Sequence, residues 1–148
     1  MKIKIFALTH KKFEVPQDKM YQPLQVGREE KEDLGYLCDN TGDNISAENC
    51  YYSELTGLYW IWKNVHTYKY VGTCHYRRYL LNEQEKIFTE AEYLELLKDY
   101  DLITTKRVVL NNSYHYGFAT NHNIHALDMT GEVIKELYPE YYDTFVQL

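Results

Sequence analysis

The chain opens with Lys2-Ile-Lys-Ile-Phe-Ala-Leu-Thr9, and the fold class follows from this segment. It begins with polar–apolar alternation and ends as a continuous apolar run, which is typical of a strand that enters the core of a sheet. Further buried strands are predicted over residues 69–74 and 100–104. Helical patterns separate these strands, so the sequence predicts an α/β fold with a largely parallel sheet flanked by helices.

Between and after these strands, apolar residues recur with a helical period. Helices are expected over residues 55–65, 89–98 and 124–138. Thr89 and Glu92 have the spacing of a capping box, which marks the start of the second helix. In the first helix, five residues form the apolar face expected to pack in the core: Leu55, Leu58, Tyr59, Trp62 and Val65.

Composition and charge exclude several classes of protein. The 148 residues include 16 Lys and Arg against 22 Asp and Glu, a net charge of −6, which argues against broad nucleic-acid binding through phosphates. No apolar run approaches the roughly 20 residues of a membrane-spanning helix. The first apolar run ends at Leu8 and Thr9-His10-Lys11-Lys12 follows, so we expect no export signal. Three cysteines without a CxxC pair fit reduced thiols in a cytoplasmic protein.

The segment after the strand at 69–74 is the richest in chemistry. His75, Arg77 and Arg78 place two fixed positive charges and one titratable group within four residues. Guanidinium groups suit phosphate oxygens because their planar fork bonds two oxygens at once, so these residues predict a diphosphate site. Alternatively, the arginines pair with the acidic segment 83–101 or face water. GxGxxG and GxxxxGK[ST] are absent, which argues against a dinucleotide oxidoreductase or a P-loop kinase.

A second group of candidate ligands is His122, His125 and Asp128, spaced three residues apart. Histidine and carboxylate side chains on one helix can hold zinc or a similar ion, which would fit a metal-dependent hydrolase. Spacing of three and three drifts around a helix, however, so only two of the three would share a face well. The alternative interpretation is a set of exposed polar residues at the start of a helix.

Three strings resemble a bacterial family first catalogued as a domain of unknown function, whose members are labelled capsular or exopolysaccharide biosynthesis glycosyltransferases. The resemblance covers nearly the whole chain, and its most specific parts are ELTGLYWIWKN and CHYRRY. The strings are Asp39-Asn-Thr-Gly-Asp-Asn-Ile-Ser46, Tyr52-Ser-Glu-Leu-Thr-Gly-Leu-Tyr-Trp-Ile-Trp-Lys-Asn64 and Tyr70-Val-Gly-Thr-Cys-His-Tyr-Arg-Arg-Tyr79.

The resemblance implies a Rossmann-like, nucleotide-diphospho-sugar transferase (GT-A-like) fold. It further implies that residues 1–148 form one glycosyltransferase-like domain, the N-terminal, donor-binding part of a longer family domain that is incomplete at its C-terminus. The implied function is transfer of a sugar from a nucleotide-diphosphate donor, with a UDP-sugar favoured, to a growing capsular polysaccharide, exopolysaccharide or lipid-linked acceptor. We expect a cytoplasmic protein, with peripheral attachment at the inner face of the membrane. A non-catalytic sugar-nucleotide-binding module is the alternative.

The resemblance also implies roles for individual residues. The donor diphosphate would lie against His75, Arg77 and Arg78. Five residues would contact the nucleotide or its sugar: Thr9, His10, Asp39, Asn40 and Glu54. For Glu54 the alternative is a helix N-terminus stabilised by its carboxylate. Three residues would lie on the acceptor side: His115, Tyr116 and His122. No residue stands out as the catalytic base.

Many transferases of this fold hold Mn²⁺ or Mg²⁺ with an Asp-x-Asp after the strand that corresponds to residues 69–74. Here Cys74-His75-Tyr76-Arg77-Arg78 stands at that place, so the sequence predicts no firm ligand set for the cation, and a bound Mn²⁺ or Mg²⁺ is the alternative. We expect the arginines, aided by His75, to neutralise the leaving diphosphate directly.

Overall fold

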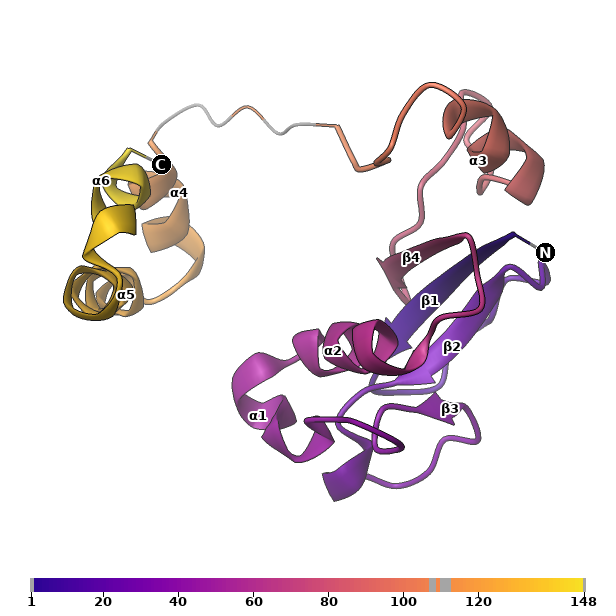
Figure 1. Cartoon of the computed structure of the whole chain (residues 1–148), viewed down its shortest axis with the longest axis horizontal. Helices are drawn as coiled ribbons and strands as arrows, with labels where there is room; N and C mark the ends of the chain where they lie inside the picture. Colours follow the sequence, from indigo (N-terminus) through magenta and orange to yellow (C-terminus); the bar gives the residue numbers. More distant parts are fainter. Residues whose placement is uncertain (1, 107–108, 110–112, 148) are drawn as a thin grey trace. The chain divides into compact units, whose positions relative to one another are not determined.

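The structure, a computed structural model, describes residues 2–106, 109 and 113–147. The chain divides into two compact units (Figure 1), Met1–Thr104 and Thr105–Leu148. The first unit carries the sheet, and the elements described in the second unit are helices.

Four parallel strands form the sheet of the first unit: β1 (Ile3–Thr9), β2 (Tyr21–Gln25), β3 (Leu37–Cys38) and β4 (Tyr70–His75). Their order is β3-β2-β1-β4, so β1 is paired on both sides. The predicted fold class, an α/β fold with a parallel sheet flanked by helices, is confirmed. The predicted strands at the chain start and at 69–74 correspond to β1 and β4. Residues 100–104, which lie within the described range, are not in a strand, and Ile103 packs against the core instead.

Strand β2 was not predicted from the sequence because it contains Pro23. The backbone N–H of Val26 donates to Thr9 O, so alternate residues of β2 direct their nitrogen toward β1. The nitrogen of Pro23 therefore points to the other side, where β3 pairs with Leu24 and Gln25 alone. A proline is tolerated there because no ladder hydrogen bond is lost.

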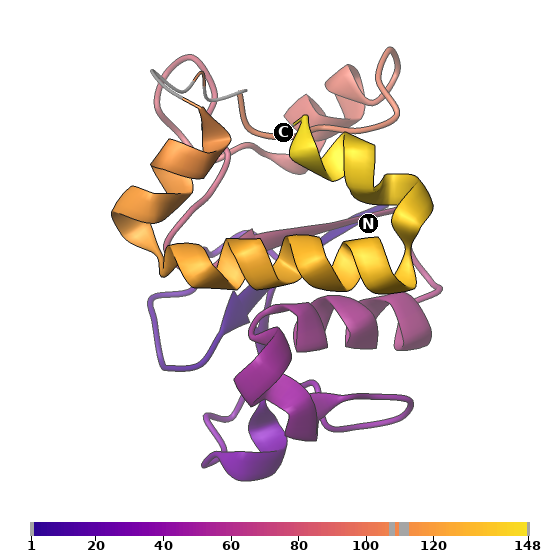
Figure 2. The same ribbon diagram turned by 90° about the vertical axis from the view of Figure 1, so that its left-hand side faces the viewer.

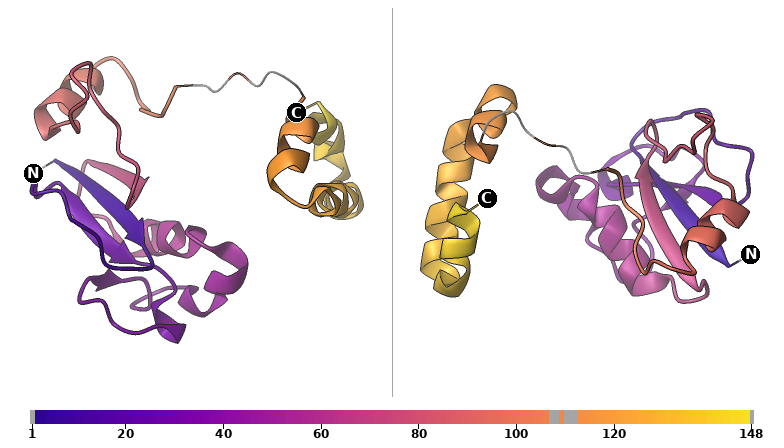
Figure 3. Two further views of the ribbon diagram at one scale, coloured as in Figure 1. Left: turned by 180° about the vertical axis from the view of Figure 1, so that it is seen from behind. Right: turned by 90° about the horizontal axis from the view of Figure 1, so that it is seen from above.

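Two clusters of buried side chains cover the two faces of the sheet. On one face Phe6 and Leu8 of β1 pack with Trp60 and Ile61 of α2 (Leu55–Asn64). On the other face Ile3 and Ile5 pack with Tyr93 of α3 (Glu90–Leu96). Figure 3 shows α2 and α3 on opposite sides of the strands. Alternation along β1 thus supplies both halves of the core.

The predicted core face of α2 is wrong for three of its five residues, whereas Val65 packs against the buried cluster as expected. The helix buries Thr56, Gly57, Trp60 and Ile61, whereas the predicted residues Leu55, Leu58 and Trp62 are exposed, Trp62 by 66%. The reason is the close approach at Gly57, where an added Cβ would lie 2.6 Å from Val26 Cγ1 and 2.9 Å from Leu8 Cδ2. Apolar residues lie on both faces of α2, so their period alone did not determine the face that packs on the sheet.

The predicted start of α3 is confirmed. Thr89 Oγ1 accepts a hydrogen bond from Glu92 N, and Glu92 Oε2 accepts one from Thr89 N at 2.8 Å, which completes the capping box. Glu90 ties the helix to β1, because its carboxylate accepts from the backbone N–H groups of Lys2 and Ile3. These hydrogen bonds lower the pKa of Glu90.

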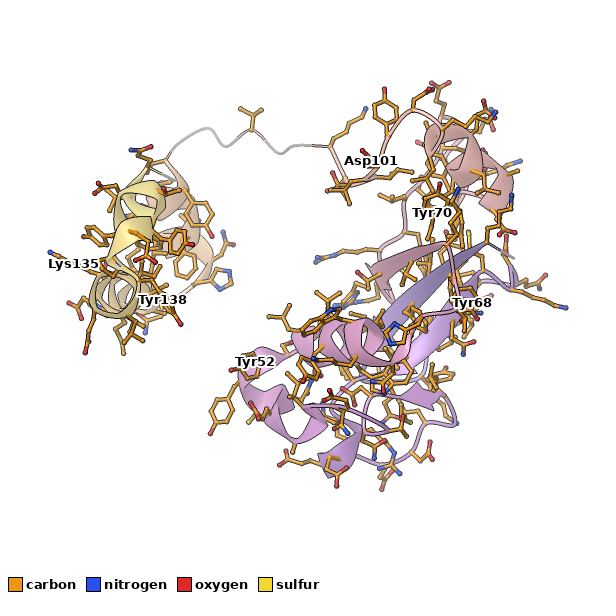
Figure 4. The ribbon with its side chains drawn as sticks, viewed as in Figure 1. Tyr52, Tyr68, Tyr70, Asp101, Lys135 and Tyr138 are labelled. Carbon is orange, nitrogen blue, oxygen red and sulfur yellow. The ribbon has the colours of Figure 1, made fainter. Side chains whose placement is uncertain are left out.

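Three short helices lie in the connections of the first unit besides α2 and α3. They are η1 (Arg28–Glu30), η2 (Ser46–Glu48) and α1 (Asn49–Tyr52). Tyr52 lies at the surface where α1 leads into α2 (Figure 4).

Three α-helices and a short 3₁₀-helix make up the second unit: α4 (Tyr114–Asn121), α5 (Ile124–Leu137), η3 (Pro139–Tyr141) and α6 (Tyr142–Val146). Figure 2 shows α5 along its length, with α6 folded back beside it. Gly131 of α5 is buried and faces the ring of Phe145. The helix expected over 124–138 is confirmed. Within the described residues no helix has the length and apolarity needed to cross a membrane.

Replacing Gly57 by Val should lower the free energy of unfolding by about 2 kcal/mol, because the new side chain overlaps Val26 and Leu8. The matched control is Leu58→Val, which introduces valine at the neighbouring exposed position. It should change the free energy of unfolding by at most about 0.5 kcal/mol. Urea denaturation followed by circular dichroism measures both. Equal stability of the two variants would contradict the close contact between α2 and the sheet.

Candidate functional site

The carboxyl end of β4 continues into a tight turn over residues 75–78, called the arginine turn below. Arg78 N donates to His75 O at 2.8 Å, and Arg77 N donates to His75 Nδ1 at 3.1 Å. Tyr76 N donates to Leu8 O, so the turn starts beside the end of β1. The carboxyl ends of neighbouring parallel strands are where polar groups gather in α/β folds.

Glu54 faces the imidazole of His75 from the start of α2. Its Oε1 lies 3.3 Å from His75 Nε2, and the two side chains are 46% and 16% exposed. Because Nδ1 accepts from Arg77 N, the proton of the neutral ring is on Nε2 and points to Glu54. Burial lowers the pKa of His75, and Arg77, Arg78 and His10 lower it further against the opposing effect of Glu54. The ring is therefore neutral at pH 7.

Tyr76 forms the centre of an aromatic and cationic group. Its side chain is only 5% exposed, and its ring contacts those of His10 and Phe13 at centroid distances of 5.6 and 5.7 Å. Lys11 Nζ and Arg77 Cζ lie 5.6 and 5.1 Å from the centroid of the Tyr76 ring. The sequence analysis missed Lys11 and Tyr76; their positions directly after β1 and within CHYRRY were the available signals.

Arg77 and Arg78 are exposed, and in the described part of the chain neither forms an ion pair. The alternative in which they pair with the acidic segment 83–101 is therefore not observed. Two guanidinium groups without carboxylate partners, beside Lys11, give this edge of the sheet a positive surface. Such a surface suits an anion with several oxygens.

Thr9 and His10 lie beside the arginine turn and differ in exposure. Thr9 is buried, and its hydroxyl donates to Lys11 O and accepts from Lys11 N at 3.1 Å, which shapes the segment that carries Lys11. His10 is exposed and packs edge-on against Tyr76. Of these two residues, His10 is the one that a ligand can reach.

Asp39 has a different environment from the one expected for a nucleotide contact. It is fully buried, and its carboxylate accepts four hydrogen bonds. The donors are Gly27 N at 2.8 Å, Arg28 N at 3.1 Å, Ser46 Oγ at 2.6 Å and Thr56 Oγ1 at 2.7 Å. The side chain thus faces the interior and joins the end of β2 to α2. Its neighbour Asn40 donates to Glu29 Oε2 at the surface.

The loop 39–46 is also held to α2 farther along the helix. Trp60 Nε1 donates to Thr41 O at 2.8 Å. Asn64 Nδ2 donates to Asp43 O at 2.8 Å, and Asp43 N donates back to Asn64 Oδ1 at 3.2 Å. Residues 39–46 and 52–64, two of the three strings that carry the family resemblance, are therefore joined by hydrogen bonds.

In the second unit, the expected ligands do not converge on one point. Asp128 lies 3.8 Å from His115 and 3.9 Å from His125, whereas the ring of His122 stacks on Phe118. No three His, Cys, Asp or Glu side chains of the described residues are grouped to hold a metal, so the alternative zinc site is not formed. His115 and Asp128 line a hollow of about 500 Å³ in this unit. Lys135 of α5, labelled in Figure 4, lines the same hollow. Tyr116 and His122 are exposed on α4 and at its end.

The residues at the end of β4 do not fit Mn²⁺ or Mg²⁺ either. These cations prefer several carboxylate oxygens, whereas in the described residues Glu54 faces arginines and a lysine here and no three His, Cys, Asp or Glu side chains are grouped to hold a metal. Burial raises the pKa of Cys74 to about 12, so its thiol stays protonated and is neither a ligand nor a nucleophile at neutral pH.

Comparisons with known proteins agree with this architecture. A family model described as "Domain of unknown function (DUF4422)" matches residues 4–148. The apo structure of WbbM, a bifunctional glycosyltransferase, is similar over 95% of this chain, with a TM-score of 0.74 and 26% sequence identity. This chain covers 30% of that solved chain. A search of curated proteins finds no match.

Replacing Asp39 by Asn should lower the free energy of unfolding by roughly 3 kcal/mol, because the new amide nitrogen faces a hydrogen-bond donor in a buried place. The control is Asp43→Asn in the same loop, where the side chain is 59% exposed. Thermal and urea denaturation measure the difference. An Asp39→Asn variant as stable as Asp43→Asn would show that the carboxylate does not hold the loop to α2.

Proposed function

The chain belongs to the DUF4422 family, and on this premise we propose that it is a glycosyltransferase domain that binds a nucleotide-diphosphate sugar, with a UDP-sugar favoured. The observation that carries the proposal is the arginine turn: two exposed guanidinium groups without ion pairs, in the described residues, at the carboxyl edge of a parallel sheet. The likeness to a glycosyltransferase structure supports the reaction class. The proposed acceptor is a growing capsular polysaccharide, exopolysaccharide or lipid-linked oligosaccharide at the inner face of the membrane.

In the proposed reaction, the bond between the sugar C1 and the phosphate oxygen breaks, and its electron pair leaves with the diphosphate. The acceptor hydroxyl forms the new bond to C1, and its proton passes to solvent. Arg77 and Arg78 bind the diphosphate as this charge develops, and fixed cations at such a place contribute several kcal/mol to transition-state stabilisation. Lys11 supplies a third positive charge from the segment after β1. The step needs no metal ligand at this edge.

The other residues proposed for the site are either exposed or buried, and their proposed roles differ accordingly. His10, Asn40 and Glu54 have polar atoms at the surface of the first unit and are proposed to meet the nucleotide or donor sugar. Thr9 and Asp39 are buried and are proposed to act by shaping the segments that carry Lys11 and Asn40. His115, Tyr116 and His122 are proposed for the acceptor side.

A sugar-nucleotide-binding module without transferase activity is the second candidate. It is favoured by one observation: the carboxylate beside the arginine turn, Glu54, already faces His75 Nε2 at 3.3 Å, whereas transfer needs a base for the acceptor hydroxyl. Saturable binding of UDP-sugars without release of UDP in the presence of an acceptor mixture would identify this function.

UDP should raise the melting temperature of the protein, and the shift should survive a chelator, because arginines rather than a metal hold the diphosphate. UDP at 100 times its Kd adds about 2.7 kcal/mol of stability, which differential scanning fluorimetry detects easily. Arg77→Ala/Arg78→Ala should remove the shift. Lys86→Ala/Lys98→Ala changes the net charge equally at exposed positions of the same unit and should keep it.

A shift that appears only with Mn²⁺ would contradict the metal-free diphosphate site. An unchanged shift in the double arginine variant would place the nucleotide elsewhere in the chain. No shift of the native protein with any nucleotide would overturn the proposed donor binding.

A further inference from the structure

We infer that His75 is a positioning residue that shapes the arginine turn, and that it does so only as the neutral ring protonated on Nε2. The inference rests on the proposed function, in that the arginine turn is the proposed diphosphate site. It gives His75 a role other than that of a third positive charge against the phosphates.

One residue anchors both arginines of the turn. His75 O accepts from Arg78 N at 2.8 Å, and its ring nitrogen Nδ1 accepts from Arg77 N at 3.1 Å. Two successive backbone N–H groups are thus fixed by one residue, which limits the directions that the two guanidinium groups can take. A ring that rotates away would free Arg77 N and loosen the turn.

Glu54 fixes the ring from the opposite side. Its carboxylate is 3.3 Å from Nε2, and Glu54 itself follows Ser53, whose backbone has φ 50° and ψ −127°. This conformation is rare for a residue with a side chain. Asn49 Nδ2 holds it by donating to Ser53 O at 2.6 Å. The backbone at the start of α2 therefore places the carboxylate where it selects the Nε2–H tautomer.

Protonation of the ring conflicts with this arrangement. An imidazolium carries hydrogen on both nitrogens, so its Nδ1–H would point at the Arg77 N–H instead of accepting from it. The groups that face the ring are Glu54 from the start of α2, His10 from the segment after β1, and Arg77 and Arg78 from the turn itself, while the ring of Tyr76 lies 4.3 Å away between centroids. Of these only Glu54 favours the charged ring. Acidification should therefore weaken anion binding, whereas a role as a simple positive charge would strengthen it.

Two substitutions separate the nitrogens of the ring. In His75→Asn, the side-chain oxygen lies near the position of Nδ1 and can accept from Arg77 N as in an Asx turn, but the contact with the Glu54 carboxylate is lost. His75→Gln reaches toward Glu54 but loses the acceptor for Arg77 N. On amide hydrogen exchange, Arg77 should be protected in the native protein and in His75→Asn and unprotected in His75→Gln. Long-range ¹H–¹⁵N spectra of the native protein should show hydrogen on Nε2 and none on Nδ1. Protection of Arg77 in His75→Gln, or hydrogen on Nδ1 at neutral pH, would overturn the inference without any ligand.

Calorimetric titration with UDP-glucose tests the link to binding, because its phosphates do not titrate between about pH 5.5 and 8, where an ordinary histidine does. The native protein should bind more weakly as the pH falls, and His75→Asn should show no such fall. At about pH 8, His75→Gln should bind roughly tenfold more weakly than His75→Asn, the expected effect of one lost hydrogen bond. Binding that strengthens on acidification would overturn the positioning role. No binding by the native protein at any pH would overturn the proposed donor site, and the exchange experiment would still decide the role of His75.

Discussion

The buried carboxylate of Asp39 is the constraint on which the first unit depends. A charge with no exposure must be compensated by hydrogen bonds, and four donors from three separate segments do so. Gly27 can offer its N–H because its φ of 64° turns the chain sharply after β2. Thr56 offers its hydroxyl from the first turn of α2. This interaction therefore sets where α2 begins, and with it the place of Glu54 beside His75.

The parts of the fold that sequence could predict are those in which local pattern and tertiary structure agree. The apolar run of β1 and the capping box at Thr89 are local signals, and both are confirmed. The predicted core face of α2 was wrong because the helix contacts the sheet through Gly57 rather than through the larger apolar residues. The burial of Asp39 had no local signal, because its donors lie from seven to 17 residues away.

The sequence could predict which charged residues form the candidate site, but not the contacts that hold them. The two arginines and His75 stood out as a cluster of charge in the sequence, and the structure adds which groups hold them. Backbone N–H groups of the turn bond to His75, whereas the guanidinium groups stay exposed. Lys11 joins from another strand end, which no spacing rule could reveal, because parallel strands bring distant segments to one edge.

The hydrogen bonds between Trp60 and Thr41 and between Asn64 and Asp43 have a consequence for what a family resemblance can report. They join two of the three strings on which the resemblance rests, and the side chains of Trp60 and Asn64 are engaged in holding a loop against a helix. A likeness in these two strings therefore indicates that two chains share the loop and the helix it packs against. It carries no information about the sugar that either chain binds.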